Sequence, residues 1–171
     1  MPSRKADLPS QPQVAVLLRL LDQAFDHKAW HGPTLKGALR GVSAAEAAFR
    51  PAPGRHSVWE LAVHCAYWKY TVWRQLTGAK AGSFPLAGSN WFERPEAGNA
   101  SETDWKRELA LLSSCHRELR AAVAALKDDQ LDDRPPGSKY PVRELVMGAA
   151  SHDLYHAGQV SLVKRLSTGS V

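Results

Sequence analysis

Two histidines near the C-terminal end of the chain, His152 and His156, have a spacing that suits metal chemistry. Residues four apart lie on one face of a helix, so both imidazoles can reach one ion. The pair falls within an otherwise apolar stripe, where four imidazole nitrogens would need partners. A divalent ion satisfies two of those nitrogens at once, so the pair predicts a metal site. The stripe consists of Leu145, Ala149, His152, His156, Val160 and Val163.

A metal site needs a third protein ligand, and the sequence offers two candidates. His64 shares a predicted helix face with Leu61, Trp68 and Val72, and it is the better placed of the two. His116 lies on the apolar stripe of another helix and is its rival. Three imidazoles with one open position are typical of catalytic metal sites. A second pair with the same spacing, His27 and His31, adjoins Gly32-Pro33, which interrupts a helix.

Other side chains near the histidine pair are candidates for supporting roles. Asp153 and Tyr155 are candidate catalytic residues, and Asp153 could instead orient a ligand imidazole or form a structural ion pair. Gln159 shares a face with Tyr155 and could donate or accept a hydrogen bond across the bundle. Trp91-Phe92 lies in a long loop, where it could cover the open metal position or simply attach the loop to the bundle.

The elements that must position these residues are all helical. Apolar spacing and capping patterns predict long helices from about residue 13, over 57–77, from 101 to about 126, and over 141–166. Short helices are expected at 34–40 and from Ser43, and the loop at 79–100 is long. We therefore expect an all-α, antiparallel four-helix bundle, with one domain at 13–168 and a disordered leader at 1–12.

Composition excludes several classes of protein. The 171 residues are 44% hydrophobic and 23% charged, which suits one globular domain. No apolar run approaches the roughly 20 residues of a membrane span, and the polar opening is unlike a signal peptide, so a cytoplasmic protein is expected. The net charge of +5 is scattered, which argues against specific nucleic-acid binding. Cys65 and Cys115 form no C-x-x-C motif and are expected to be buried free thiols.

Two segments resemble motifs of the DinB/YfiT-like superfamily, a group of damage-inducible bacterial helical bundles. They are Gly54-Arg-His-Ser-Val-Trp-Glu-Leu-Ala-Val-His-Cys-Ala-Tyr-Trp68 and the stretch from Tyr140-Pro-Val-Arg-Glu-Leu-Val to Ser151-His-Asp-Leu-Tyr-His-Ala-Gly-Gln159. Trp30-His-Gly-Pro33 is similar to a subgroup of the family. The resemblance implies a four-helix bundle, often dimeric, in which His64, His152 and His156 bind a divalent ion such as Zn²⁺ or Ni²⁺. It implies no ligand role for His116.

The resemblance also suggests the kind of chemistry. Relatives include thiol-dependent S-transferases, and others are suspected hydrolases, so the expected partner is a small-molecule substrate, with a low-molecular-weight thiol as one candidate. The alternative is a non-catalytic metal-binding or stress-response bundle. A ferritin-like di-iron site is poorly supported, because Asp153-x-x-His156 is the only pairing near its Glu-x-x-His spacing.

Overall fold

The computed structural model describes residues 10–169, and in this range the chain is helical without strands. The predicted all-α bundle is confirmed. Of the predicted leader, residues 1–9 lie outside the described residues, and the first helix begins at Pro12. Short 3-10 helices lie at Ala97–Asn99 and Asp128–Gln130. The α-helices are α1 (Pro12–Phe25), α2 (Leu35–Ala38), α3 (Ala44–Ala48), α4 (Val58–Thr77), α5 (Glu102–Ala124) and α6 (Val142–Ser167).

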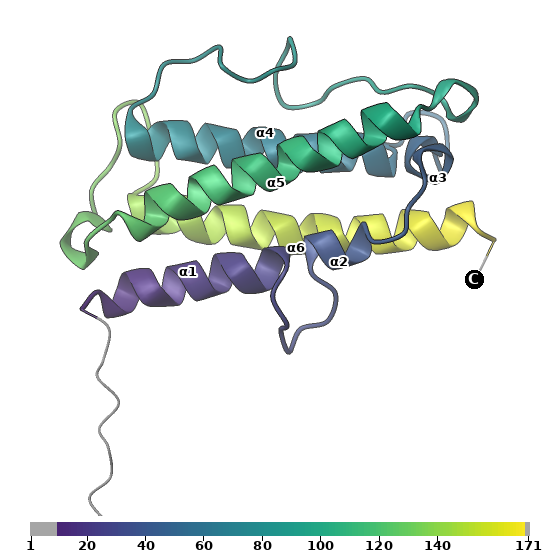
Figure 1. Ribbon diagram of the computed structural model, residues 1–171. Helices are drawn as coiled ribbons and strands as arrows, with labels where there is room; N and C mark the ends of the chain where they lie inside the picture. The colour runs from purple at the N-terminus through teal and green to yellow at the C-terminus, as the bar shows by residue number, and fades with distance from the viewer. Residues whose placement is uncertain (1–9, 170–171) are drawn as a thin grey trace, which may run out of the picture.

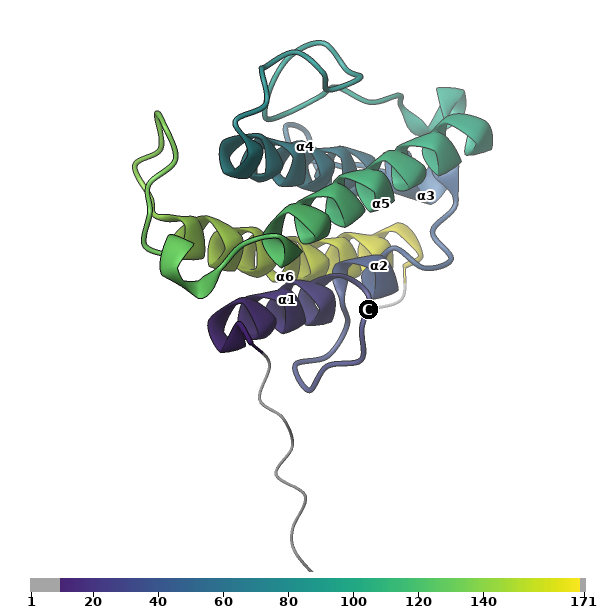
Figure 2. The same ribbon diagram turned by 60° about the vertical axis from the view of Figure 1, so that its left-hand side comes forward.

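The four long helices α1, α4, α5 and α6 lie side by side (Figures 1 and 2). α6 runs opposite to α4, since Lys69 in α4 contacts Asp153 while His64, further back, contacts His156. α4 and α5 run in the same direction, because the 78–101 loop carries the chain back along the bundle (Figure 1). The expected antiparallel packing thus holds for α4 with α6 and for α1 with α5, and the long loop makes α4 and α5 parallel.

The helix boundaries follow from local capping chemistry. Capping-box patterns at Ser43, Ser57 and Ser101 predict three helix starts, and Ser43 with Glu46 and Ser57 with Glu60 form complete boxes at the starts of α3 and α4. α4 ends at Gly78, whose φ of +69° is a conformation that glycine adopts without strain. Ser101 caps α5 through the backbone N–H of Asp104, but that box is not completed by the Asp104 side chain. α1 ends at Phe25, whereas the sequence pattern predicts a helix that frays only near residues 29–32.

The buried face of α6 differs by about one position from the predicted stripe. Ala149, His156, Val160 and Val163 are buried as expected. Leu145 and His152 are only partly buried, because they lie at the edge of the α4–α6 contact. The interior of the bundle is instead completed by other α6 residues, namely Val142, Val146, Ala150, Asp153 and Ala157.

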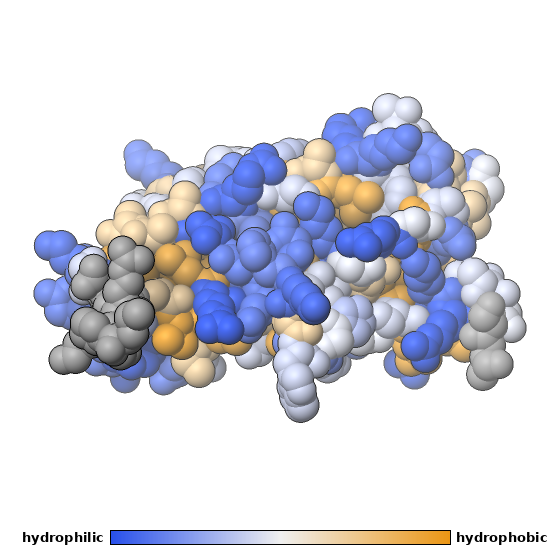
Figure 3. All heavy atoms as spheres, turned by 60° about the horizontal axis from the view of Figure 1, so that its bottom comes forward, coloured by the Kyte–Doolittle hydropathy of each residue, from blue (hydrophilic) through white to orange (hydrophobic). Residues whose placement is uncertain are grey.

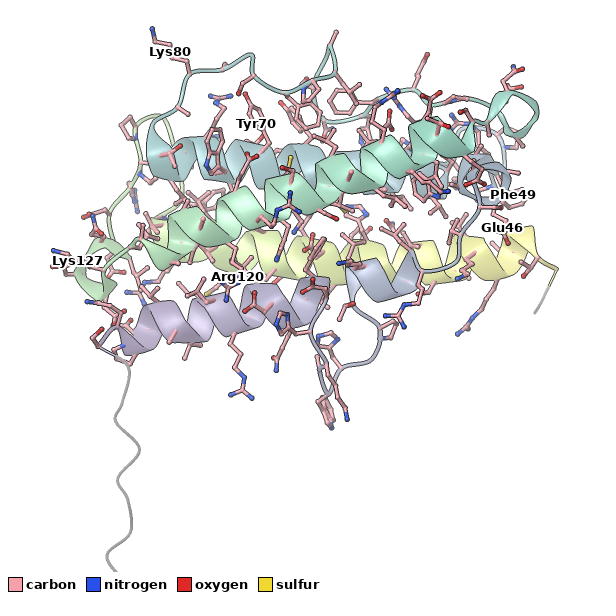
Figure 4. All side chains as sticks on the ribbon, viewed as in Figure 1. Glu46, Phe49, Tyr70, Lys80, Arg120 and Lys127 are labelled. Carbon is pink, nitrogen blue, oxygen red and sulfur yellow. The ribbon has the colours of Figure 1, made fainter. Side chains whose placement is uncertain are left out.

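A bidentate ion pair connects α1 to α5. Arg120 donates to the two carboxylate oxygens of Asp22 at 2.6 and 2.9 Å, and its side chain points from α5 toward α1 (Figure 4). Burial would raise the pKa of Asp22, but these hydrogen bonds and the charge of Arg120 lower it below its ordinary value. The pair fixes α1 against α5.

The molecular surface on the α1 side is mostly hydrophilic at its centre, and apolar side chains gather beside the start of α1 (Figure 3). Val16 and Met147 are exposed there and line a shallow hollow together with Pro12 and Leu131. None of the helices among residues 10–169 is long and apolar enough to span a membrane. Homodimer formation stays a prediction.

Candidate metal centre

The middle of α4 faces the middle of α6, and this contact brings the three predicted ligands together. His64 lies two turns into α4, whose start the Ser57 capping box fixes. His152 and His156 project from successive turns of α6 toward it. Nε2 of His152 is 3.0 Å from Nε2 of His64 and 3.1 Å from Nε2 of His156. The three side chains form a group that could hold a metal ion.

Hydrogen bonds on the far side of two rings determine which nitrogens face the centre. Nδ1 of His64 donates to the backbone carbonyl of Asn90 at 2.8 Å. Nδ1 of His156 donates to Oε1 of Gln159 at 2.6 Å. In a neutral imidazole only one nitrogen carries a proton, so Nε2 of His64 and Nε2 of His156 both present lone pairs.

A metal ion fits this arrangement better than a hydrogen-bonded triad does. His152 can bring at most one proton to its Nε2, so it can satisfy only one of the two lone pairs beside it. A lone pair left without a partner in a buried site is costly. Donor separations near 3 Å are close to the roughly 3.3 Å edge of a tetrahedron with Zn–N bonds of about 2.0–2.1 Å. The donor set therefore fits a divalent ion with one position left open.

The protein keeps these imidazoles neutral, as metal ligands must be. Burial lowers the pKa of His152 to about 3 and that of His156 to about 4, and the neighbouring imidazoles contribute in the same direction. Burial also lowers the pKa of His64, although its bond to Asn90 opposes the change. Because protons do not compete for these nitrogens near neutral pH, the site is ready for a cation.

Aromatic rings surround His64. Trp91 stacks on its imidazole with ring centroids 3.8 Å apart, and His56 stacks on the opposite face of Trp91 at 3.6 Å. Trp68 lies edge-on to both His64 and His152, each at 6.3 Å. These rings restrict the orientation of His64.

Of the two roles predicted for the Trp91-Phe92 pair, the structure shows attachment of the loop, and a cover over the open metal position stays a prediction. Phe92 is buried and packs against Tyr67 and Phe84, which attaches the loop to the bundle. Trp91 remains partly exposed and covers one face of the ligand His64. The loop is further tied down where Ser83 donates to the hydroxyl of Tyr70, which points from α4 toward the loop (Figure 4).

Asp153 takes part in a buried ion pair with Lys69, which is one of the three roles predicted for it. Both side chains are 1% exposed. Nζ of Lys69 also lies 3.4 Å from Nδ1 of His116 and 5.0 Å from the ring centroid of Phe25. His116 is stacked on Phe25 inside the bundle and takes no part in the histidine group, as the resemblance implied. Lys69 was not singled out from the sequence, although it is a cation in an apolar stretch.

Tyr155 and Gln159 lie on the outer side of α6. Tyr155 is 65% exposed, with its ring 5.0 Å from that of His156. Gln159 does not bond across the bundle as expected but accepts from His156 on its own helix, because three residues along a helix bring the two side chains together.

Cys65 and Cys115 are free and buried, as predicted. Burial raises the pKa of Cys115 to about 12 and that of Cys65 well above its ordinary value, so both are neutral thiols. The thiol of Cys65 also lies near donor atoms of His152 and Asp153, within 4.8 Å. Since Asp153 is already paired with Lys69, this second group is a weaker metal site than the three histidines.

Asn90 is the site residue that sequence analysis missed. Its carbonyl orients His64, and its side-chain oxygen accepts from Nε1 of Trp68 at 2.9 Å. Its φ of +63° is the only positive value outside glycine among the described residues. An asparagine next to Trp91 in a polar loop gives no periodic signal that it contacts α4.

Comparison with known proteins agrees with this geometry. No curated protein and no solved structure matches the chain. A family model described as the DinB superfamily matches residues 29–160, which include all three histidines of the site and most of the bundle. The chain therefore belongs to the DinB superfamily.

Proposed function

We propose that this protein is a divalent-metal-dependent enzyme, with His64, His152 and His156 holding Zn²⁺ or Ni²⁺. The observation that carries the proposal is the convergence of three Nε2 atoms, two of which must present lone pairs. When bound, such an ion lowers the pKa of a thiol or a water molecule at its open position and so supplies a nucleophile at neutral pH.

The surroundings of the site suit thiol transfer, which needs no general base. Asp153, the nearest carboxylate on α6, is paired with Lys69 inside the bundle, where it is unsuited to act as a general base. A thiol that loses its proton on binding the ion needs no such base. Asn90 and Gln159 hold two of the ligand imidazoles in their neutral tautomers, and Trp91 shields one face of His64 from water. We therefore propose thiol S-transfer to a small electrophile as the reaction.

The first experiment measures metal content in the purified, untagged protein. The His152→Ala/His156→Ala variant is compared with His27→Ala/His31→Ala, a matched control with the same spacing outside the site. About one equivalent of metal in the wild type and the control, and none in the site variant, would support the proposal. Absence of metal even after incubation with Zn²⁺ and Ni²⁺ would contradict it.

The second experiment tests the reaction. Metal-loaded protein is incubated with small thiols and an aromatic halide, and separately with a nitrophenyl ester. Thiol conjugation that the site variant lacks would support S-transfer. Ester cleavage alone would indicate hydrolysis, and inactivity of a fully loaded protein in both assays would favour the non-catalytic metal-binding bundle.

A further inference from the structure

A groove between α4 and α6 extends away from the histidines. Its volume is about 660 Å³, within the range of sites that bind small organic molecules. His152 and Trp68 lie at its inner end, and the 137–140 turn borders its outer end. A molecule lying in the groove therefore brings one end to the proposed metal ion. Its wall is formed by Trp68, Thr71, Val72, Gln75, Gly137, Ser138, Lys139, Tyr140, Glu144, Leu145, Met147, Gly148, Ala149 and His152.

The groove has a mostly apolar interior, in which Thr71 and Gln75 are uncharged polar residues, and it carries charge only at its rim. Val72 and Ala149 are buried in its wall, and Leu145 is partly buried there. Lys139 and Glu144, the only charged residues of the lining, are exposed and of opposite sign. Between this rim and the proposed metal ion at the inner end, the wall has no charged side chain to compensate an ionised group.

Large apolar side chains are left uncovered along the same groove. Trp68 is 38% exposed, Tyr140 57% and Met147 48%. Adjacent exposed apolar side chains on a soluble protein mark a surface that a ligand or partner covers. The three side chains come from α4, the 137–140 turn and α6, so they flank the groove from different elements.

The hollow on the other side of the site has different chemistry. It is about 590 Å³ in volume and includes His156 and Trp91. Arg55 and His56 lie in its lining, together with the polar side chains of Tyr155 and Gln159. The two hollows reach the histidine group at different ligands, His152 and His156, and the second has more polar side chains near its ligand, although Leu61, Leu162 and Val163 also line it.

We infer that the α4–α6 groove binds the uncharged, apolar body of the substrate, which makes that substrate a neutral alkyl or aromatic molecule. The inference rests on the proposed function for the identity of the reacting end, but binding in the groove can be measured without turnover. The hollow beside His156 is left for the second reactant.

The test uses two probes that differ by one group. N-phenyl-1-naphthylamine is neutral, and 8-anilinonaphthalene-1-sulfonate has the same ring system with an added anion. We expect saturable binding of the neutral probe at one site, at least tenfold tighter than binding of the anionic probe. The protein's net charge of +5 would favour the opposite order on electrostatics alone.

Two glycines of α6 supply a matched pair of variants. A Cβ at Gly148 or at Gly158 meets nothing within 4 Å, so either position accepts a larger side chain, but only Gly148 lines the groove. Gly148→Leu should lower the affinity for the neutral probe at least tenfold, and Gly158→Leu should leave that affinity unchanged. If Gly148→Leu fails to fold, Met147→Lys places a charge on the groove wall and should weaken the probe likewise.

Metal content is measured on the same samples, so that the two proposals can fail separately. Equal probe affinity in wild type and both glycine variants, or tighter binding of the anionic probe, overturns the groove assignment even when one equivalent of metal is present. Loss of probe binding in Gly148→Leu but not in Gly158→Leu supports the groove as the binding site even when no metal binds. In that case only the proposed function fails.

Discussion

The backbone carbonyl of Asn90 accepts a hydrogen bond of 2.8 Å from Nδ1 of His64. This contact joins the 78–101 loop to the metal centre, because it places the proton on the outer nitrogen of the ring and turns Nε2 toward His152. The carbonyl is held in place by a left-handed backbone at Asn90 and by the bond from Trp68 to its side chain. The loop is thus part of the site.

Substitution of Asn90 should therefore weaken metal binding without removing a ligand. Asn90→Val strains the positive φ and displaces the carbonyl, so we expect about a 10- to 100-fold loss of metal affinity. Glycine adopts a positive φ without strain, so the metal affinity of Asn90→Gly should fall only a few-fold. Competition with a chromophoric chelator measures the metal affinity of both variants. Asn99→Val, in the same loop but in an exposed 3-10 helix, is the control. Wild-type affinity in Asn90→Val would contradict the positioning role.

The second prediction concerns the buried pair of Lys69 and Asp153. Lys69→Met leaves an unpaired carboxylate inside the bundle, so we expect the free energy of unfolding to fall by about 3–5 kcal/mol. Replacing both partners, as Lys69→Met/Asp153→Leu, should recover most of that loss. Urea unfolding measures all three proteins.

The matched control for this pair is an exposed one. Arg107 and Asp104 are 68% and 42% exposed, so Arg107→Met should change the stability by less than about 1 kcal/mol. A Lys69→Met variant as stable as Arg107→Met would show that the buried pair is not a structural contact.

Local patterns account for the parts of the molecule that the sequence predicted. Ser43 with Glu46 and Ser57 with Glu60 are neighbours along the chain, so the capping boxes could be identified without the fold. His152 and His156 are likewise four residues apart on one helix. His64 was already preferred over His116 from its helix face, and the resemblance then removed His116, although both lie on helix faces that could face α6.

Contacts that depend on the path of a loop or the rotation of a helix were not predicted. Asn90 reaches α4 only because the 78–101 loop crosses back over the bundle. Lys69 meets Asp153 only because α6 is rotated about one position from its predicted stripe. The groove beside His152 depends on the same rotation, which leaves that residue at the edge of the helix contact.

The third prediction is a pH dependence that originates at His116. Burial lowers the pKa of His116 from 6.5 to about 3, and the nearby positive charge of Lys69 makes a smaller contribution in the same direction. Below pH 6.5 the unfolded chain binds a proton that the folded protein does not, so stability falls as the pH falls. As the pH falls from 6.5 to 5, this group alone should lower the free energy of unfolding by about 2 kcal/mol.

A variant without the titrating group isolates this contribution. His116→Asn keeps an acceptor for Lys69 but does not titrate, so its stability should fall less than that of the wild type over the same pH range. Urea unfolding at pH 7, 6.5, 6 and 5, with chelator in every sample, compares the two slopes. Parallel slopes would mean that His116 takes up a proton in the folded protein.

The fourth prediction concerns the hydroxyl of Thr71, which is buried without a hydrogen-bond partner among the described residues. Valine has nearly the same shape and no hydroxyl, so Thr71→Val removes the cost of an unpaired polar group. We expect stability to rise by about 1 kcal/mol. Thr77 on the same helix is the control, because its hydroxyl is exposed and donates to the carbonyl of Trp73 at 2.9 Å. Thr77→Val should leave the stability unchanged or slightly lower it. A loss of stability in Thr71→Val would show that the hydroxyl has a partner, such as an ordered water molecule at the groove wall.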